Sequence, residues 1–403
     1  MYSFFHKSTI VTLAFILFAC QNHTNSQTPK RSVSETQNTI GGGCEGCELM
    51  YVGMPQTLTS VHQSIGWNQG HTRLIITGKV VQIDGKTPAP NVVIYYWHTN
   101  DEGLYEANAQ TPKKALVHGR LRGWVKTDAH GNYMIKTSRP AAYPNDSIPQ
   151  HIHLSIKEPD LTKEYYADLY FDDDPLYLRH KKRYGKLDRA GTELLRIVLD
   201  DTVQIAEHNI VLGLHIPNYP KHLDKRVDSG LSIGDDQPSF MPYHFFGPDR
   251  GTRACPVCRY GRYHGLVYFV SEKSSLDEIK KWLVFLDQQS VIRKHYLKAY
   301  LVYVGSRRYS KDVSEKMLQE WGQMLRLQHV ALTYVPSFND EDTEMHRNKI
   351  NPSVESTIVL FKHRTIVDKW INLKPSPENF DTVIQAIVNS KGNFFDLPEP
   401  RHE

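Results

Sequence analysis

The hydrophobic positions follow a strand-like rhythm in the first half of the chain. Between residues 72 and 219, short runs of β-branched and aromatic residues alternate with turn-forming residues, as in "RLIITGKVVQ" at 73–82 and "NYMIKTS" at 132–138. No helical period appears before "AGTELLR" at 190–196. Short strands at this spacing are typical of an all-β sandwich or barrel.

After Gly261 the rhythm changes to an alternation of strands and helices. The pattern predicts, in chain order, a strand at 265–271, a helix at 275–290, a strand at 298–306, a helix at 313–327, a strand at 330–336, a hairpin at 356–373 and a helix at 378–390. Such alternation indicates an α/β sheet with mainly parallel strands, closed by the hairpin.

The length and the change of rhythm predict a multidomain chain. A chain of 403 residues is long enough for two ordinary domains, each with its own core. Residues 221–253 are rich in Lys, Asp, Gly and Pro and are predicted to be a linker. The β-sandwich is then expected at 49–220 and the α/β domain at 254–395.

The first twenty residues have the features of a signal peptide. An apolar run at 10–18 follows His6 and Lys7 and is too short to span a bilayer. A small residue directly before Cys20 resembles a bacterial lipoprotein signal, in which the cysteine carries the lipid; a plain signal peptide with a cysteine is the alternative. Residues 21–48 are predicted to be a flexible tether with a C-x-x-C pair. We expect an extracytoplasmic protein that is anchored by lipid to a bacterial membrane, and we expect this membrane to be the outer membrane.

The charge pattern argues against a nucleic-acid partner. The chain has 48 Lys and Arg against 44 Asp and Glu, so a formal charge of +4 is spread over its whole length. A nucleic-acid-binding protein is expected to show a concentrated basic patch instead. The oligomeric state does not follow from the sequence.

The remaining four cysteines form two close pairs. These are Cys44 with Cys47 in "CEGC", and Cys255 with Cys258 in "CPVC". Outside the cytoplasm such pairs are free to oxidise, so two local disulfides are expected. A redox-active pair and a zinc site shared by all four cysteines are the alternatives. The zinc site is the least favoured, because the two halves are separated by a whole domain.

A pair of histidines is the first candidate for chemistry. In "PQHIHLSI" at 149–156, His151 and His153 are separated by Ile152. On a β-strand the two imidazoles would share one face, and two neutral imidazoles can form half of a metal site. The alternative is two polar residues on the wet face of a strand.

The neighbouring motifs give this pair its context. From about 71 to 220, the order "ITGKVVQIDGKTPAPNVVIYYWHTNDEGLY", "GWVKTDAHGNYMIKTSRPAAYP", "PQHIHLSI", "ADLYF" and "NIVLGL" resembles the intradiol ring-cleavage dioxygenases. These are non-haem iron(III) oxidoreductases. The resemblance implies an antiparallel β-sandwich, an iron(III) cofactor, and cleavage of a catechol by dioxygen to a muconate-type diacid.

The resemblance also implies four iron ligands. Tyr105 closes the family's W-x-x-N-x-x-G-x-Y segment, and Tyr143 lies in its R/K-P-x-x-Y-P turn. His151 and His153 fill P-x-H-x-H. In the family, the tyrosine of the turn leaves the metal when the catechol binds, which makes Tyr143 the expected leaving ligand and transient base. Anionic phenolate oxygen suits a ferric ion, because metal binding lowers the pKa of its ligand.

Two positions depart from the family pattern. Ile148 stands where the family commonly has an arginine over the substrate, and Asp168 stands where it has a glutamine. Loss of a cation beside a developing anion can cost a few kcal/mol of transition-state stabilisation. Arg122, or else Arg139, is the candidate replacement. A metal-binding or aromatic-binding module without turnover is therefore the alternative to an active dioxygenase.

A ferrous site with two histidines and one carboxylate is a second metal hypothesis. It would use His151, His153 and an acid such as Asp168. It leaves Tyr105 and Tyr143 without a role, so the ferric site is preferred.

The α/β half resembles a thioredoxin-like domain. "STIVLFKHRTIVDKW" is similar to the terminal hairpin of that fold. The family's redox cysteines follow the first core strand, whereas "CPVC" precedes the strand at 265–271, and Ser356 occupies the place of the facing proline. A structural or docking role is expected, with disulfide exchange as the alternative.

Other polar features receive ordinary interpretations. His98 and His118 are scattered and are predicted to be surface residues, and the basic run at 179–183 is predicted to be a solvated loop.

Overall fold

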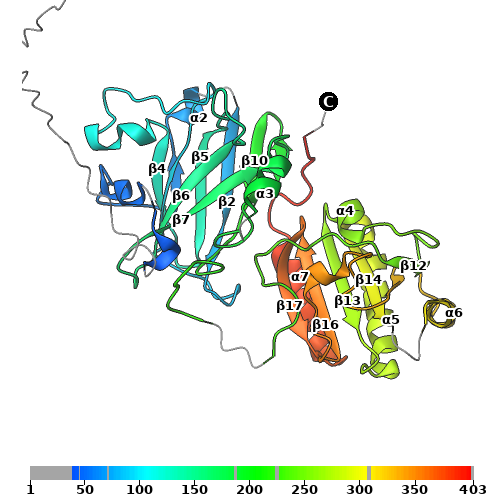
Figure 1. Ribbon diagram of the computed structural model, residues 1–403. Helices are drawn as coiled ribbons and strands as arrows, with labels where there is room; N and C mark the ends of the chain where they lie inside the picture. The colour runs from blue at the N-terminus through cyan, green and yellow to red at the C-terminus, as the bar shows by residue number, and fades with distance from the viewer. Residues whose placement is uncertain are drawn as a thin grey trace, which may run out of the picture.

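The structure is a computed structural model that describes residues 39–44, 46–69, 72–185, 188–222, 227–305 and 310–400. The predicted signal peptide, Cys20 and most of the predicted tether lie outside the described residues. Across these described ranges, no helix is long and apolar enough to cross a bilayer. Figure 1 shows two domains side by side, the first in blue to green and the second in yellow-green to red.

The first domain consists of two sheets packed face to face. Its strands are β1 (Val61–Gln63), β2 (Arg73–Val81), β3 (Val93–Trp97), β4 (Arg122–Lys126), β5 (Asn132–Ser138), β6 (His151–Lys157), β7 (Tyr165–Phe171), β8 (Leu194–Leu195), β9 (Ile197–Asp200), β10 (Val203–Glu207) and β11 (Ile210–Val211). Its helical segments are η1 (Ile40–Gly42), η2 (Cys47–Tyr51), α2 (Gly66–Gln69), η3 (Lys113–His118) and α3 (Tyr177–Tyr184). One sheet has the order β1-β5-β2-β10-β9, with β11 on β2, and the other has the order β4-β3-β6-β7-β8.

Alternation along the strands separates the core from the outer face. On β6, Ile152, Leu154 and Ile156 are at most 1% exposed and pack in the core between the sheets. His151 and His153 point to the opposite face because successive side chains of a strand alternate. The same rule turns Asp168 on β7 away from the core.

The predicted sandwich is confirmed, but the prediction that it is purely antiparallel is wrong. β1 pairs with β5 in parallel, and both β10 and β11 run parallel to β2. β8 also runs parallel to β7. The sheet that carries the histidine pair remains antiparallel from β4 to β7. The β10–β2 pair is parallel because the β9–β10 hairpin joins the sheet with β10 running in the direction of β2.

Three local predictions also need correction. The basic run at 179–183 lies within α3, where Tyr177 is buried and Lys181 pairs with Asp188 and Glu193. The segment 190–196 contains the short strand β8 at Leu194–Leu195 and no helix. Residues 39–44 and 46–48 of the predicted tether pack on the domain, since Gly41 N donates to Pro217 O at 2.7 Å and Cys47 is buried.

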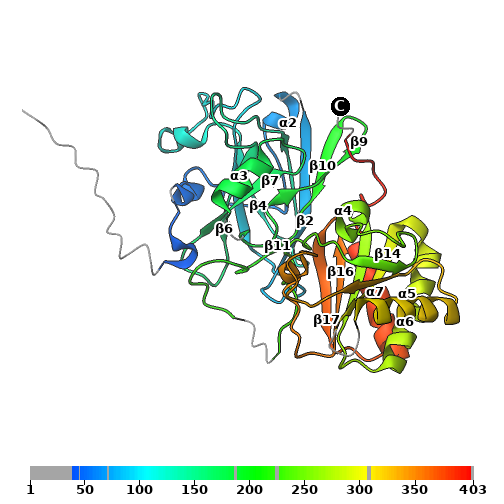
Figure 2. The ribbon, with the colours of Figure 1, turned by 45° about the vertical axis from the view of Figure 1, so that its right-hand side comes forward.

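The second domain is a six-stranded sheet with its three long helices on one face. Its strands are β12 (Tyr243–Phe246), β13 (His264–Val270), β14 (Leu297–Val304), β15 (Ala331–Val335), β16 (Ser356–Lys362) and β17 (Thr365–Ile371), in the order β12-β15-β14-β13-β16-β17. Its helical segments are α4 (Pro256–Tyr260), α5 (Leu276–Arg293), η4 (Lys294–Tyr296), α6 (Lys311–Met324), η5 (Met345–Asn348) and α7 (Pro377–Ser390). Side chains of α5, α6 and α7 share one core with alternate residues of β13. Figure 2 shows these three helices beside the strands of this domain.

The predicted alternation of strands and helices is confirmed for this domain, but the sheet is mixed and not mainly parallel, because β12 and β16 join it antiparallel to their neighbours. β13, β14 and β15 are parallel, and the β16–β17 hairpin is antiparallel. The thioredoxin-like identity stays a prediction. β12 lies within the predicted linker at 221–253, yet it pairs with β15, so the later part of that segment belongs to the second sheet. The domains touch through ion pairs of Lys362 with Glu207 and of Arg196 with Asp236.

Candidate metal centre

Four side chains named from the sequence converge at one point. The hydroxyl oxygens of Tyr105 and Tyr143 lie 2.7 Å apart. The Tyr143 hydroxyl is 3.1 Å from His151 Nε2, which is 3.1 Å from His153 Nε2. Two donor atoms that share a metal at about 2.1 Å each lie roughly 3 Å apart. The spacing of this cluster, which we call the Tyr2His2 cluster, therefore fits one shared metal ion.

The two tyrosines reach the cluster from loops that are held together. Asn100 Oδ1 accepts hydrogen bonds from the backbone N of Glu102 and Leu104, which folds the turn before Tyr105. A Cβ at Gly103, whose φ is +78°, would collide with the carbonyl oxygen of Ala142 next to Tyr143. Only glycine allows so close an approach. The asparagine and glycine of the W-x-x-N-x-x-G-x-Y segment thus position the ligand loop.

Each imidazole of the cluster is oriented through its other nitrogen. His151 Nδ1 donates to the carbonyl oxygen of Pro149 at 2.7 Å, and His153 Nδ1 donates to Asp168 Oδ1 at 2.7 Å. A carbonyl or carboxylate oxygen only accepts, so the proton of each neutral ring is on Nδ1. Such outer contacts are typical of metal-bound histidines.

The donor chemistry of the cluster also fits a cation. With both protons on Nδ1, two Nε2 lone pairs face each other without a hydrogen between them. Burial lowers the pKa of His151 to about 4, which keeps this ring neutral near pH 7. A cation between the lone pairs would remove their repulsion. The two phenols add the oxygen ligands that a hard ferric ion requires.

The phenols are protonated when no cation is bound. Burial, together with the hydrogen bond to Tyr143, raises the pKa of Tyr105, and burial raises the pKa of Tyr143. A bound metal would instead lower the pKa values of both phenols. In the part of the chain that the structure describes, no group of three or more His, Cys, Asp and Glu side chains could hold a metal. The cluster differs from such a group because half of its members are tyrosines.

An aromatic wall beside His153 was missed in the sequence. The Trp97 ring stacks on His153 at 4.9 Å and on His118 at 4.1 Å between centroids. His118 is buried and its Nδ1 contacts the Tyr95 hydroxyl at 2.9 Å. His98 is also buried, so the surface prediction for both histidines is wrong. Alternation along β3 could have placed Tyr95 and Trp97 on the face of His153.

The arginines proposed as catalytic cations are engaged elsewhere. Arg122 donates to the Tyr95 hydroxyl at 3.2 Å and to Val52 O at 2.9 Å. Arg139 makes a two-pronged ion pair with Asp173. Within the described ranges, no hydrogen bond or ion pair joins either arginine to the Tyr2His2 cluster. The structure therefore does not bring Arg122 together with the predicted ligands.

Asp168 lies behind His153 rather than beside its Nε2. The carboxylate contacts Nδ1, on the far side of the ring from His151. Burial acts to raise the pKa of Asp168, but the hydrogen bond from His153 leaves the pKa below its usual value. The geometry thus contradicts the site with two histidines and Asp168 as a third ligand.

A cavity of about 260 Å³ is lined by Asp168, the partner of His153, and by Tyr170, but by none of the four cluster side chains. The Tyr170 ring on its wall is 5.8 Å from the His151 ring. Its walls include Tyr166, Asp168, Tyr170, His180, Tyr184 and Arg189. The cavity is smaller than the range of about 300–1,000 Å³ of pockets for larger ligands, so a single aromatic ring suits it.

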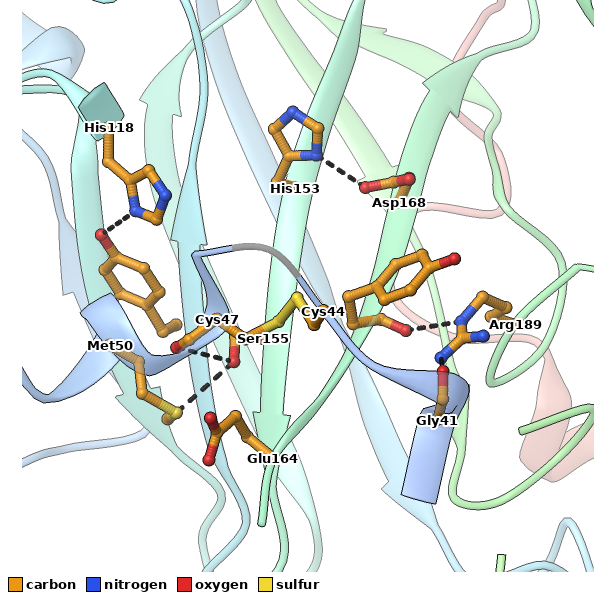
Figure 3. Close-up of a disulfide and its surroundings, with 12 residues drawn as sticks. Gly41, Cys44, Cys47, Met50, His118, His153, Ser155, Glu164, Asp168 and Arg189 are labelled. Atoms are coloured by element: carbon orange, nitrogen blue, oxygen red, sulfur yellow. Dashed lines mark hydrogen bonds and ion pairs between the residues drawn. A yellow bond between two sulfur atoms is a disulfide. The ribbon is translucent and has the colours of Figure 1, made fainter. Parts of the chain in front are cut away.

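Both cysteine pairs form the local disulfides that were predicted. The Cα atoms of Cys44 and Cys47 are 5.6 Å apart, and those of Cys255 and Cys258 are 5.3 Å apart. Figure 3 shows the first disulfide beside the sheet face of His153 and Asp168. The second lies at the start of α4, before β13, as the sequence order requires. Local pairing leaves no thiols for a shared zinc site.

The comparisons concern the first domain. Residues 50–183 match a family model described as Dioxygenase. The protocatechuate 3,4-dioxygenase beta chain of Burkholderia cepacia is 31% identical over 137 residues, which cover 32% of this chain and 58% of that protein. The catechol 1,2-dioxygenase of Acinetobacter baylyi is 32% identical over 109 residues, which cover 27% of this chain and 32% of that protein.

A solved structure also aligns with the chain. The hydroxyquinol 1,2-dioxygenase of Pseudomonas putida DLL-E4 shows 22% identity over 45% of this chain and 68% of that chain, with a TM-score of 0.31. A score this low supports no conclusion of its own. This chain spans 58% and 32% of the lengths of the two curated relatives. Residues 50–183 are thus similar to ring-cleaving dioxygenases that act on catechol and protocatechuate, by the family model and by these relatives.

Proposed function

We propose that the first domain cleaves a catechol-type ring between its two hydroxyls with dioxygen, giving a muconate-type diacid. The iron(III) ion for this reaction would be held by Tyr105, Tyr143, His151 and His153. The observation that carries the proposal is the convergence of two phenol oxygens and two imidazole nitrogens within 2.7–3.1 Å of their neighbours. The names of the curated relatives support the same reaction class.

The side chains have separate tasks in this proposal. When bound, the ferric ion would supply Lewis-acid and template chemistry for the catechol and dioxygen. His151 and His153 hold their Nε2 atoms in place through their Nδ1 contacts. Tyr143, on a loop, is the ligand proposed to leave, and its free phenolate oxygen would accept the proton of a catechol hydroxyl. Tyr105, whose oxygen lies 2.7 Å from that of Tyr143 in the metal-free structure, is proposed to stay on the iron together with the two histidines.

The cavity beside the cluster supports an aromatic substrate. Tyr166, Tyr170 and Tyr184 contribute rings to its walls, and ring faces pack favourably against another ring. On the same walls, the positive charges of Arg189 and Lys181 are balanced by the carboxylates of Asp168 and Glu193. We propose this cavity as the place where the ring of the substrate lies.

A binding module without turnover is the second candidate. Ile148 removes the family cation, and both Arg122 and Arg139 are held by other partners. Such a module would bind iron and catechols without consuming dioxygen.

Oxygen uptake by the iron-loaded chain with a panel of catechols separates the two candidates. An active dioxygenase consumes one dioxygen per ring and forms a diacid, while Tyr143→Phe keeps the iron and loses most of the rate. Bound iron with no oxygen uptake from any catechol would leave only the binding module.

We also propose that the protein is anchored outside the cytoplasm through lipid on Cys20. Two local cysteine pairs suit an oxidising compartment. A Cys20→Ala variant should move from the membrane fraction to the soluble fraction and should not incorporate labelled fatty acid. Equal membrane retention of both proteins would rule out this anchor.

A further inference from the structure

The two histidines of the Tyr2His2 cluster differ in the charge behind them. His151 donates from Nδ1 to a neutral carbonyl, that of Pro149. His153 donates to the carboxylate of Asp168 at the same distance, 2.7 Å. The strand register places Asp168 of β7 directly opposite His153 of β6. The contact is therefore fixed by the sheet, not by a loop.

Asp168 is committed to this one contact. Within the described residues, its carboxylate forms no other hydrogen bond or ion pair than the one with His153. Arg189 lines the same cavity, but its guanidinium donates to the carbonyl oxygens of Tyr166 and Gly41. The carboxylate charge is thus directed at the His153 ring.

We propose that Asp168 is a positioning residue that also tunes the iron through His153. This proposal rests on the proposed function. A carboxylate on Nδ1–H draws the proton away from the ring and makes Nε2 a stronger donor than a neutral acceptor would. It also adds a negative charge to a centre with two phenolates. The ferric state is then stabilised over the ferrous state, and the iron accepts electron density from the phenolates less readily.

The glutamine that the resemblance places here in related enzymes would give the hydrogen bond without the charge. Asp168→Asn in the full iron-loaded chain also keeps the hydrogen bond and removes the charge, because the amide oxygen of asparagine can still accept from Nδ1–H. Iron content should stay at the wild-type level. The tyrosinate-to-iron charge-transfer band should move to longer wavelength, and the iron(III)/iron(II) midpoint potential should rise.

Two further variants separate tuning from support. Glu164→Gln removes a charge just before β7, where the side chain accepts a hydrogen bond from Tyr51, and should leave the band and potential unchanged. Asp168→Ala removes the contact and should lower iron affinity by about 10–100-fold, as outer-contact mutations do. The asparagine variant should restore that affinity without restoring the band.

The outcomes are distinct. An asparagine variant with the wild-type band and potential would show that Asp168 only positions the ring, and would overturn the tuning proposal alone. An asparagine variant that loses iron as the alanine variant does would overturn it as well. Wild-type protein that binds no iron would overturn both this proposal and the proposed function.

Discussion

The two domains place their reactive side chains differently. In the first, Tyr105, Tyr143 and His151 come from separate segments and meet within hydrogen-bonding distance. In the second, Cys255 and Cys258 pair with each other at α4, and Ser274, just before α5, hydrogen-bonds to the carbonyl oxygen of Glu355. The difference shows that reactive residue types make a site only where the fold brings several of them to one point.

Removal of a cluster imidazole should have the largest effect. His153→Ala should abolish stoichiometric iron binding. The iron affinity should fall by more than the factor of about 10–100 that is typical when an outer contact of a ligand is removed. Elemental analysis of the purified chain measures this. His130→Ala, at an exposed turn of the same domain, is the matched control. Equal iron in His153→Ala and wild type would remove His153 from the centre.

Tyr143→Phe should retain iron but lose turnover. The variant lacks the oxygen proposed to accept the catechol proton, and loss of a general base costs about 10²–10⁴-fold in rate. Stopped-flow oxygen consumption checks the rate, and Tyr105→Phe is the comparison that should also weaken iron binding. An unchanged rate in Tyr143→Phe would contradict its role as leaving ligand and base.

His98 should contribute to stability rather than to iron binding. Its Nδ1 hydrogen-bonds to the carbonyl oxygen of Thr99, and its Nε2 hydrogen-bonds to the hydroxyl of Thr137. Burial lowers the pKa of His98 to about 4. The unfolded chain has a pKa near 6.5, so it binds more protons, and the stabilisation is lost as pH falls from about 6.5 to about 4. The free energy of unfolding should fall by about 3 kcal/mol over this pH range.

Urea unfolding of the metal-free chain at several pH values tests that prediction. His98→Gln should flatten the pH dependence across this window, since glutamine does not titrate. A wild-type stability that does not change between pH 7 and 4 would contradict the buried, neutral assignment of His98.

Loss of the second disulfide should have the smallest effect. Replacing both Cys255 and Cys258 by serine should cost about 2 kcal/mol or less, because the closed loop is short. Iron content and oxygen uptake should not change, and neither protein should reduce insulin. Insulin reduction by wild type but not by the variant would instead assign dithiol exchange to this domain.

The sequence carried more information on the site than on the pairing of strands. β5 occupies the predicted residues 132–138, and all four predicted ligands converge, because each lies in a short motif with strong local constraints. The parallel pairs of β2 could not be predicted, since periodicity records which face a residue occupies and not which strand lies beside it.

Other features depend on tertiary contacts that leave little trace in the sequence. α3 has mostly exposed basic residues with Tyr177 as its buried residue, so it lacks the apolar period by which helices are found. The partners of Arg122 lie on β3 and in the segment after η2. The link between Asp168 and His153 requires the register of β6 and β7, which the sequence does not state.

Titration of the metal-free chain with iron(III), followed by visible absorption, tests the central claim most directly. The account predicts a tyrosinate-to-iron charge-transfer band that saturates at one iron per chain, changes in Tyr105→Phe and is absent in His151→Ala. No band in wild type, or an undiminished band in His151→Ala, would contradict the assignment of the four side chains to one ferric ion.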